Sequence, residues 1–148
     1  MAPSPPQIRL DQVNLVVSDV AASRAFYTRL GVEFERTDDE LWQHHHISAQ
    51  HGERLPLDVD LDSTSFAPKW NAGWNGAPGV ILGFKVASRP EVDELVAELA
   101  AAGARVQQEP FDAFWGARYA VVSDPDGIGV GIMSPVDPAM RSQSPDPR

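Results

Sequence analysis

The stretch VNLVVSD at residues 13–19 decides how the first half of the chain folds. Its apolar residues alternate with others at a period of two, which predicts a strand over residues 8–17. Ser18 or Asp19 can then cap a helix over residues 20–30. The strand candidates after that helix are residues 32–36, 41–48 and 55–61.

The second half of the chain repeats this order of signals. Residues 80–86 predict a strand, and the proline in Ser88-Arg89-Pro90 opens a helix with apolar residues at helical spacing up to Gly103. Gly103 lies 72 residues after Gly31, the glycine that ends the first helix. The strand candidates after the second helix are residues 104–108, 118–122 and 129–133.

The repeat predicts an α+β fold built from two tandem βαβββ modules in one domain. The segment between the modules contains Trp70 and Trp74, so we expect it to pack against the domain and to cover a cavity or a dimer interface. The proline-rich ends offer little to bury. The predicted parts are a flexible N-terminal tail (1–7), a domain (8–135) of module one (8–62), linker (63–79) and module two (80–135), and a disordered C-terminal tail (136–148).

Composition excludes several classes of function. Twelve Lys and Arg against twenty-one Asp and Glu give a net charge of −9 without a basic cluster, which argues against nucleic acid and anionic membranes as partners. The chain has no cysteine and therefore no disulfide, thiolate metal site or cysteine nucleophile. It shows no signal peptide and no long apolar run, so we expect a cytoplasmic protein.

Two strings connect the repeat to a known family: VVSD at 16–19 leading into ASRAFY at 22–27, and WGARY at 115–119 leading into DPDG at 124–127. In this order and spacing, the chain resembles the vicinal oxygen chelate superfamily, which contains glyoxalase I, extradiol dioxygenases, fosfomycin-modifying proteins and bleomycin resistance proteins. The WGARY string looks most like the antibiotic-binding, metal-free branch. The resemblance implies curved mixed sheets around a cup-shaped cavity, and a homodimer.

The resemblance also implies where metal-using members would hold a divalent metal, on the first and last strands of each module. Matching the strings places these positions at Gln12, Asp60, Ile81 and Gly131. A shift of two residues gives Asn14, Asp58, Gly83 and Gly129. Either set supplies one carboxylate and one amide, whereas a metal site normally needs three or more protein ligands. We therefore expect no metal or other cofactor.

Strand alternation indicates which side chains line the cup. The residues expected to face the helices are Val59, Leu61, Ile128, Val130 and Ile132. The residues expected to face the cup are Asp58, Asp60, Asp62, Gly129 and Gly131. The two inward glycines would leave room for a bulky ligand, or they would simply permit strong curvature of the sheet.

These expectations lead to a hypothesis of function: a small-molecule-binding protein that takes an aromatic or amphipathic ligand, such as an antibiotic. The expected ligand-binding residues are Gln12, Asn14, Trp42, Asp60, Trp115, Arg118 and Tyr119. Arg118 could pair with Asp60 or with an anionic group of the ligand. No catalytic residue is assigned, although a carboxylate of the strand 58–62 could act as a general base. The alternative is a metal-dependent glyoxalase-type lyase or isomerase, or a dioxygenase.

The tract His44-His45-His46 is a separate candidate. On a strand, His44 and His46 would share one face with their imidazoles about 6 to 7 Å apart, close enough to share a metal ion. The alternative is that both form part of a solvated or hydrogen-bonded strand face.

Overall fold

A computed structural model describes residues 8–148, so the predicted N-terminal tail lies outside the described residues. The strands are β1 (Arg9–Val17), β2 (His46–Ala49), β3 (Asp58–Ser63), β4 (Gly79–Lys85), β5 (Val106–Asp112), β6 (Arg118–Ser123) and β7 (Gly129–Met133). The α-helices are α1 (Val20–Thr28) and α2 (Arg89–Ala101). Short 3-10 turns are η1 (Trp42–His44), η2 (Ala67–Lys69) and η3 (Pro138–Met140).

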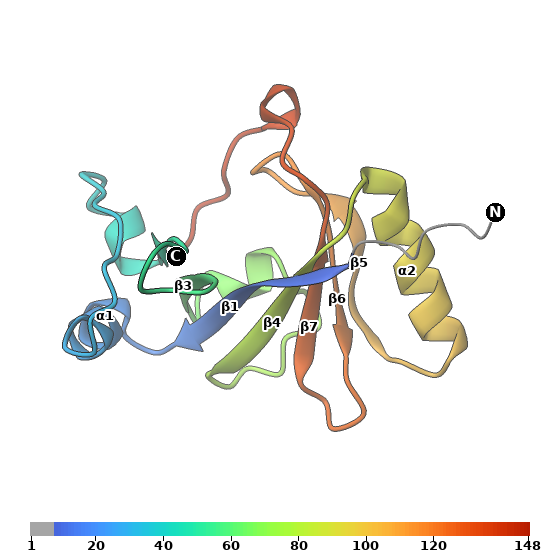
Figure 1. The fold of residues 1–148 in the computed structure, drawn as a ribbon, viewed down its shortest axis with the longest axis horizontal. Coiled ribbons are helices and arrows are strands. Elements are labelled where there is room, and N and C mark those ends of the chain that lie inside the picture. The colour runs from blue at the N-terminus through green and yellow to red at the C-terminus, as the bar shows by residue number, and fades with distance from the viewer. Residues whose placement is uncertain (1–7) are drawn as a thin grey trace.

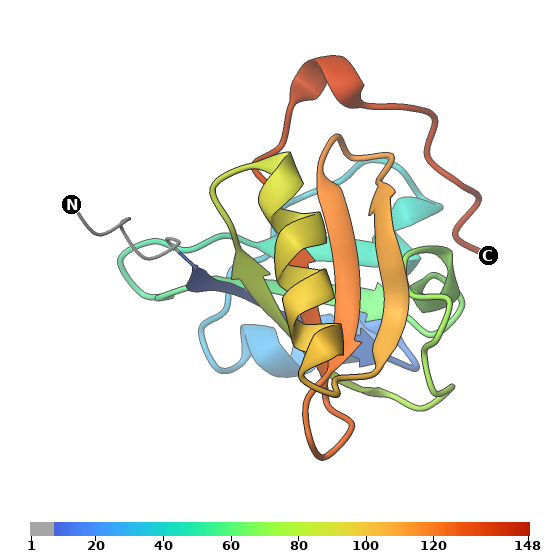
Figure 2. The same ribbon diagram turned by 90° about the vertical axis from the view of Figure 1, so that its right-hand side faces the viewer.

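The strands form one mixed sheet in the order β2-β3-β1-β4-β7-β6-β5. Within each module the first and last strands are parallel, β1 with β3 and β4 with β7, and the antiparallel pair of β1 and β4 joins the modules. The helices lie toward opposite ends of the sheet, with α1 beside module one and α2 beside module two (Figures 1 and 2). The predicted α+β fold of two tandem modules is confirmed. Within residues 8–148, no helix is both long and apolar enough to cross a membrane.

Module one differs from the prediction by one strand. Residues 32–36 form no strand, although the backbone N–H of Glu35 donates to the carbonyl of Ser48 at 2.7 Å. The predicted strand 41–48 is also wrong in its first part, because η1 precedes β2. Asp39 explains the turn, since its carboxylate accepts hydrogen bonds from the backbone N–H groups of Leu41 and Trp42.

Each helix covers its own part of the convex face. Val20 of α1 packs with Ile47 and Leu61, and the buried residues of α2 pack with Val122 and Ile132. Leu61 and Ile132 therefore face the helices, as predicted. The prediction for Ile128 is wrong: this residue precedes β7 and is 46% exposed.

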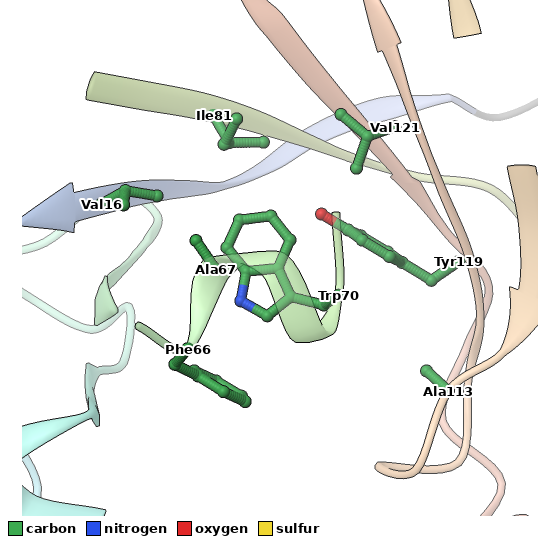
Figure 3. Packing of buried hydrophobic residues seen from close by; sticks show 8 residues of the cluster. All are labelled: Val16, Phe66, Ala67, Trp70, Ile81, Ala113, Tyr119 and Val121. Atoms are coloured by element: carbon green, nitrogen blue, oxygen red, sulfur yellow. The ribbon is translucent and has the colours of Figure 1, made fainter. Parts of the chain in front are cut away.

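The concave face of module two is filled by the linker. Figure 3 shows Trp70 between Tyr119 on one side and Phe66 and Ala67 on the other. Trp70 is 3% exposed, which agrees with the expectation that the linker packs against the domain. The indole nitrogen of Trp70 points away from Tyr119 (Figure 3).

The inward glycines of β7 do not leave an open volume for a ligand. A Cβ atom on Gly131 would lie 2.7 Å from the hydroxyl oxygen of Tyr119, and one on Gly129 would clash with the side chain of Ile81. The expectation of empty space at these positions is therefore wrong. The glycines instead accommodate two side chains of the core.

The C-terminal segment, which we expected to be disordered, makes specific contacts in the structure. The N–H groups of Asp137 and Ser142 donate to the carbonyls of Gly116 and Phe114, each at 3.0 Å. At the far end, the Ser65 hydroxyl donates to the carbonyl of Pro147, whose side chain is buried. The segment thus runs from the end of β7 back to module one (Figure 1).

Candidate functional site

Five polar side chains gather on the concave face of module one. They come from three neighbouring strands and form what we call the polar cluster: Asn14 of β1, His46 and Ser48 of β2, and Asp60 and Asp62 of β3. The register places Asn14 and Ser48 on either side of Asp60, and His46 beside Asp62. Asp60 and Asp62 thus face the cup, as strand alternation predicts.

The Asp62 carboxylate is fully engaged inside the polar cluster. Its Oδ1 lies 2.5 Å from Nδ1 of His46, and its Oδ2 accepts a hydrogen bond of 2.6 Å from Nδ2 of Asn14. The Asp62 side chain is only 2% exposed. A carboxylate removed from water in this way is stable only because both oxygens are paired.

Asp60 is less completely satisfied. Its Oδ1 accepts a hydrogen bond of 2.6 Å from the Ser48 hydroxyl, and within residues 8–148 Ser48 is the only residue that donates to this carboxylate. Asp60 is 8% exposed. One oxygen of a nearly buried carboxylate therefore remains available to a ligand.

The cluster shifts the pKa values of its members in opposite directions. Burial disfavours ionised Asp60 and raises its pKa from 3.8 to about 6, although nearby His46 opposes this shift. Burial alone would lower the pKa of His46, but the charge and hydrogen bond of Asp62 outweigh it and raise the pKa to about 9. At neutral pH His46 is therefore an imidazolium ion, and Asp60 is mostly ionised.

After the free oxygen of Asp60, the side-chain carbonyl oxygen of Asn14 is the second acceptor that lacks a partner within residues 8–148. Its Nδ2 must donate to Asp62, because a carboxylate can only accept, so its Oδ1 faces elsewhere. This Oδ1 is buried and has no hydrogen-bond partner within residues 8–148. The indole Nε1 of Trp70 is also buried, and it likewise has no hydrogen-bond partner within residues 8–148. Such orphaned groups are uncommon in folded proteins and call for a partner.

A cleft of about 210 Å³ opens beside the polar cluster. Its lining includes Trp42 together with His46 and Ser48, which belong to the cluster. Trp42 is held in place by edge-to-face packing on Phe66, with ring centroids 5.1 Å apart. The cleft thus places Trp42 beside His46 and Ser48, which bond to the buried carboxylates Asp62 and Asp60. The carboxylates themselves do not line it, and exposed Glu35 and Arg36 do. A second cleft, of about 380 Å³, lies between residues 31–33 and 50–55 and includes no member of the cluster.

The structure brings together only some of the predicted ligand-binding residues. Asn14 and Asp60 belong to the polar cluster, and Trp42 lies beside it. Gln12 lies two residues before Asn14 on β1, opposite Asp58. Trp115 and Tyr119 belong to the aromatic packing of module two, with ring centroids 5.2 Å apart. Burial raises the pKa of the Tyr119 hydroxyl far above its usual range.

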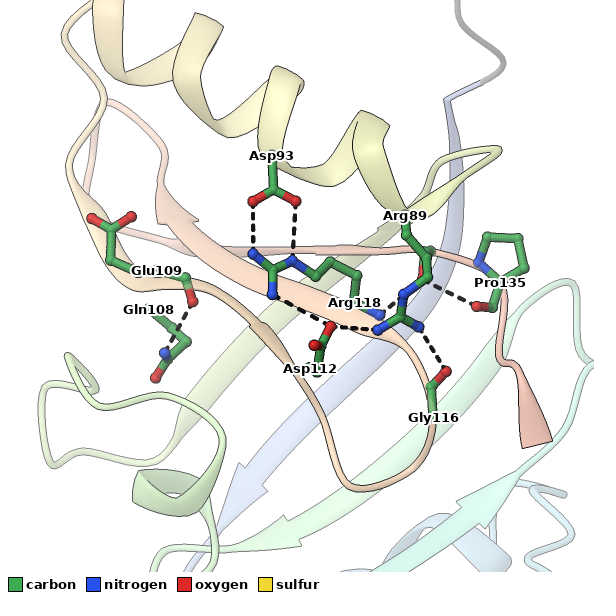
Figure 4. Close-up of polar contacts among 9 residues, drawn as sticks. Arg89, Asp93, Gln108, Glu109, Asp112, Gly116, Arg118 and Pro135 are labelled. Carbon is green, nitrogen blue, oxygen red and sulfur yellow. Dashed lines mark hydrogen bonds and ion pairs between the residues drawn. The ribbon is translucent and has the colours of Figure 1, made fainter. Parts of the chain in front are cut away.

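The prediction that Arg118 pairs with Asp60 or reaches a ligand in the cup is wrong. Figure 4 shows its guanidinium group between Asp93 of α2, at 2.8 Å, and Asp112 of β5, at 3.3 Å. Arg118 precedes inward-facing Tyr119 on β6, so strand alternation directs it to the helix-covered face. Its bonds with Asp93 and the charge of Asp112 raise the pKa of Arg118.

The histidine tract does not form the shared face that we considered. His44 lies in η1 and is exposed, whereas His45 bonds through Nδ1 to the hydroxyl of Ser63 at 2.7 Å. Only His46 enters the polar cluster. Sequence reasoning considered His46 only as a metal ligand together with His44, and it did not identify Ser48, because the role of both residues depends on pairing with the alternating acids of β3.

The side chains at the positions implied for a metal supply too few ligands to hold one. Cross-strand register groups Asn14, Asp60, Ile81 and Gly129 in one row, and Gln12, Asp58, Gly83 and Gly131 in the next. Both sets derived from the strings are therefore wrong, because each mixes residues of the two rows. In either row, module one offers one amide and one carboxylate and module two offers no donor atom. Within residues 8–148, no three His, Asp or Glu side chains converge as a metal would require.

Comparisons with solved structures agree on the fold. An extradiol ring-cleaving dioxygenase from B. fuscum is 23% identical (TM-score 0.60), covering 92% of this chain and 35% of that chain. The Mn(II)-bound glyoxalase from Novosphingobium aromaticivorans is 22% identical (TM-score 0.53), covering 86% and 38%. This chain thus spans little more than a third of either protein.

A third solved structure is similar over its whole length. A glyoxalase/bleomycin resistance protein/dioxygenase superfamily member from Vibrio splendidus is 18% identical (TM-score 0.55), and the match covers 88% of this chain and all of that chain. No curated protein matches the sequence. The sequence profile of the Glyoxalase/Bleomycin resistance protein/Dioxygenase superfamily matches residues 9–132. The chain therefore belongs to the glyoxalase/bleomycin resistance protein/dioxygenase superfamily.

Proposed function

We propose that this protein binds a small aromatic or amphipathic molecule, of the kind taken by antibiotic-binding members of its superfamily, and that it does so without a metal. The observation that supports this most is the cleft in which Trp42 stands beside the polar cluster. A flat apolar wall next to a few buried polar groups is the usual composition of a small-molecule site. The protein's net charge of −9 favours a ligand with cationic character.

The donor set supports the metal-free part of the proposal. The metal-using members of the superfamily need ligands from both modules, and here Ile81 and Gly129 stand beside Asn14 and Asp60. Both oxygens of Asp62 are already engaged by His46 and Asn14. Neighbouring Asp62 is thus already bonded within the cluster, which leaves one amide and one carboxylate from module one and no donor from module two.

Fluorescence titration against a panel of cationic and neutral aromatic compounds tests the proposal. We expect saturable quenching that is lost in Trp42→Phe and retained in Trp74→Phe, whose tryptophan lies in the linker. Elemental analysis of the purified protein provides the second readout. Stoichiometric zinc, nickel, manganese or iron, together with turnover of a substrate, would replace this proposal with a metal-dependent lyase, isomerase or dioxygenase.

A further inference from the structure

We infer that Asn14 and Asp60 bind the polar end of the ligand, and that this end is an organic cation with at least two N–H donors: a primary ammonium, an amidinium or a guanidinium group. The inference rests on the proposed function, because it identifies the chemistry of the ligand within the same site. It begins from the two acceptors that the polar cluster leaves unpaired.

These acceptors lie side by side. Asn14 of β1 and Asp60 of β3 are register partners on adjacent parallel strands, which run about 4.8 Å apart, and their side chains share the concave face. Both residues are more than nine-tenths buried, with 7% and 8% of their surfaces exposed. A head group with two divergent N–H bonds that enters this face would meet the Asn14 carbonyl oxygen and the Asp60 carboxylate together.

The other members of the polar cluster fix this arrangement. The Asn14 amide cannot turn over, since its NH₂ group is bonded to Asp62, which only accepts. Ser48 holds one oxygen of Asp60 and leaves the other without a partner within residues 8–148. The acceptors are thus oriented before any ligand arrives, and binding does not require them to be reordered.

Charge balance selects a cation. The imidazolium of His46 neutralises Asp62, to which it is directly bonded. The carboxylate of Asp60 therefore gives the cluster a net charge of −1. Calcium and magnesium ions need about six oxygen ligands, which this pair cannot supply. A monovalent organic cation matches both the single charge and the two acceptors. Trp42 lines the same cleft as Ser48, the residue that donates to Asp60, and it offers a face on which the aromatic part of the cation can stack.

Benzamidine and its neutral analogue benzamide are suitable probes, because they have nearly the same shape and differ in charge. Calorimetric titration of the wild-type protein should show benzamidinium binding at least about tenfold more tightly than benzamide. We expect Asp60→Asn to abolish that preference. The matched control is Asp58→Asn, on the same strand and face, whose carboxylate is paired with exposed His51. This control should keep the wild-type preference.

A second variant tests the role of Asn14. Asn14→Leu removes the acceptor at nearly constant volume, and circular dichroism and thermal unfolding verify that it folds. If it folds, benzamidinium affinity should fall severalfold. If it does not fold, Asp60→Asn carries the test alone.

The outcomes separate this inference from the proposed function. Equal affinity for both probes, or an equal loss in Asp58→Asn, would overturn the inference and leave aromatic binding intact. Benzamide binding without benzamidinium binding would show that the two acceptors do not select a cation, which also overturns it. If none of the panel compounds quenches the tryptophans, the proposed function fails and the inference fails with it.

Discussion

Nδ1 of His46 lies 2.5 Å from Oδ1 of Asp62, so an imidazole at the edge of a cleft is bonded to a carboxylate that is almost removed from solvent. Because the His46 side chain is 38% exposed, solvent screens part of this attraction. The pair nevertheless determines how the polar cluster responds to pH.

The His46–Asp62 pair should make stability fall at alkaline pH. The pKa of His46 rises from 6.5 to about 9 on folding, so its contribution is complete below pH 6.5 and is lost as the pH rises through 9. Urea unfolding between pH 6 and pH 10 should show this decline. His46→Gln should flatten it, whereas His51→Gln, at the exposed partner of Asp58, should not. A wild-type profile without slope in this range would contradict the prediction.

Replacing the buried carboxylate of Asp60 should stabilise the protein at neutral pH. Folding raises the pKa of Asp60 from 3.8 to about 6, so ionisation opposes folding as the pH rises through this range. A tenfold change in proton affinity corresponds to about 1.4 kcal/mol, and we expect Asp60→Asn to gain up to about 3 kcal/mol at pH 7. The gain should disappear below pH 4. Loss of stability in Asp60→Asn at pH 7 would show that the carboxylate is needed structurally.

The same ionisation should control the binding of a cationic probe. Below about pH 6, Asp60 takes up a proton and loses the charge that attracts benzamidinium. The charged groups that act on Asp60 are His46 of β2 and Asp58 and Asp62 of β3; facing it from β1 is the uncharged Asn14. Titrations from pH 5 to pH 8 should show affinity increasing through pH 6 and then levelling. The affinity for benzamide should stay constant over this range.

The packing of Tyr119 on Gly131 predicts a local steric penalty. A Cβ at residue 131 would meet the Tyr119 hydroxyl oxygen at 2.7 Å and ring carbons at 3.1 and 3.2 Å. Gly131→Ala should therefore lose about 1–3 kcal/mol of stability, and adding Tyr119→Phe should recover part of that loss. Gly79→Ala is the control, because a Cβ there meets nothing within 4 Å. Equal unfolding midpoints for both alanine variants would refute the proposed contact.

Local signals in the sequence were sufficient to predict the repeat and most of the strands. Asp19, for example, caps α1 by accepting a hydrogen bond from the N–H of Ala22, as its position before the helix predicts. Alternation also predicted that Asp60 faces the cup, and Asn14, which we expected to bind ligand, lies next to it.

Other features depend on contacts between distant parts of the chain. The metal-equivalent rows were misaligned because matched strings cannot reveal cross-strand register, and the β1–β4 pairing contains an irregularity between Leu10 and Gln12. Trp70 fills module two through packing that no local pattern encodes. The error at Arg118 was avoidable, since its neighbour Tyr119 was expected in the cup and adjacent residues of a strand face opposite sides.

The insertion of Trp70 into module two has a consequence for stoichiometry. Two copies of one structural unit would in principle offer two equivalent halves of a pocket, but a side chain of the chain itself already occupies one of them. Under the proposed function, the ligand would therefore be bound by module one alone. Saturation at a single molecule of ligand per polypeptide is the stoichiometry that such an asymmetric pair of repeats should display.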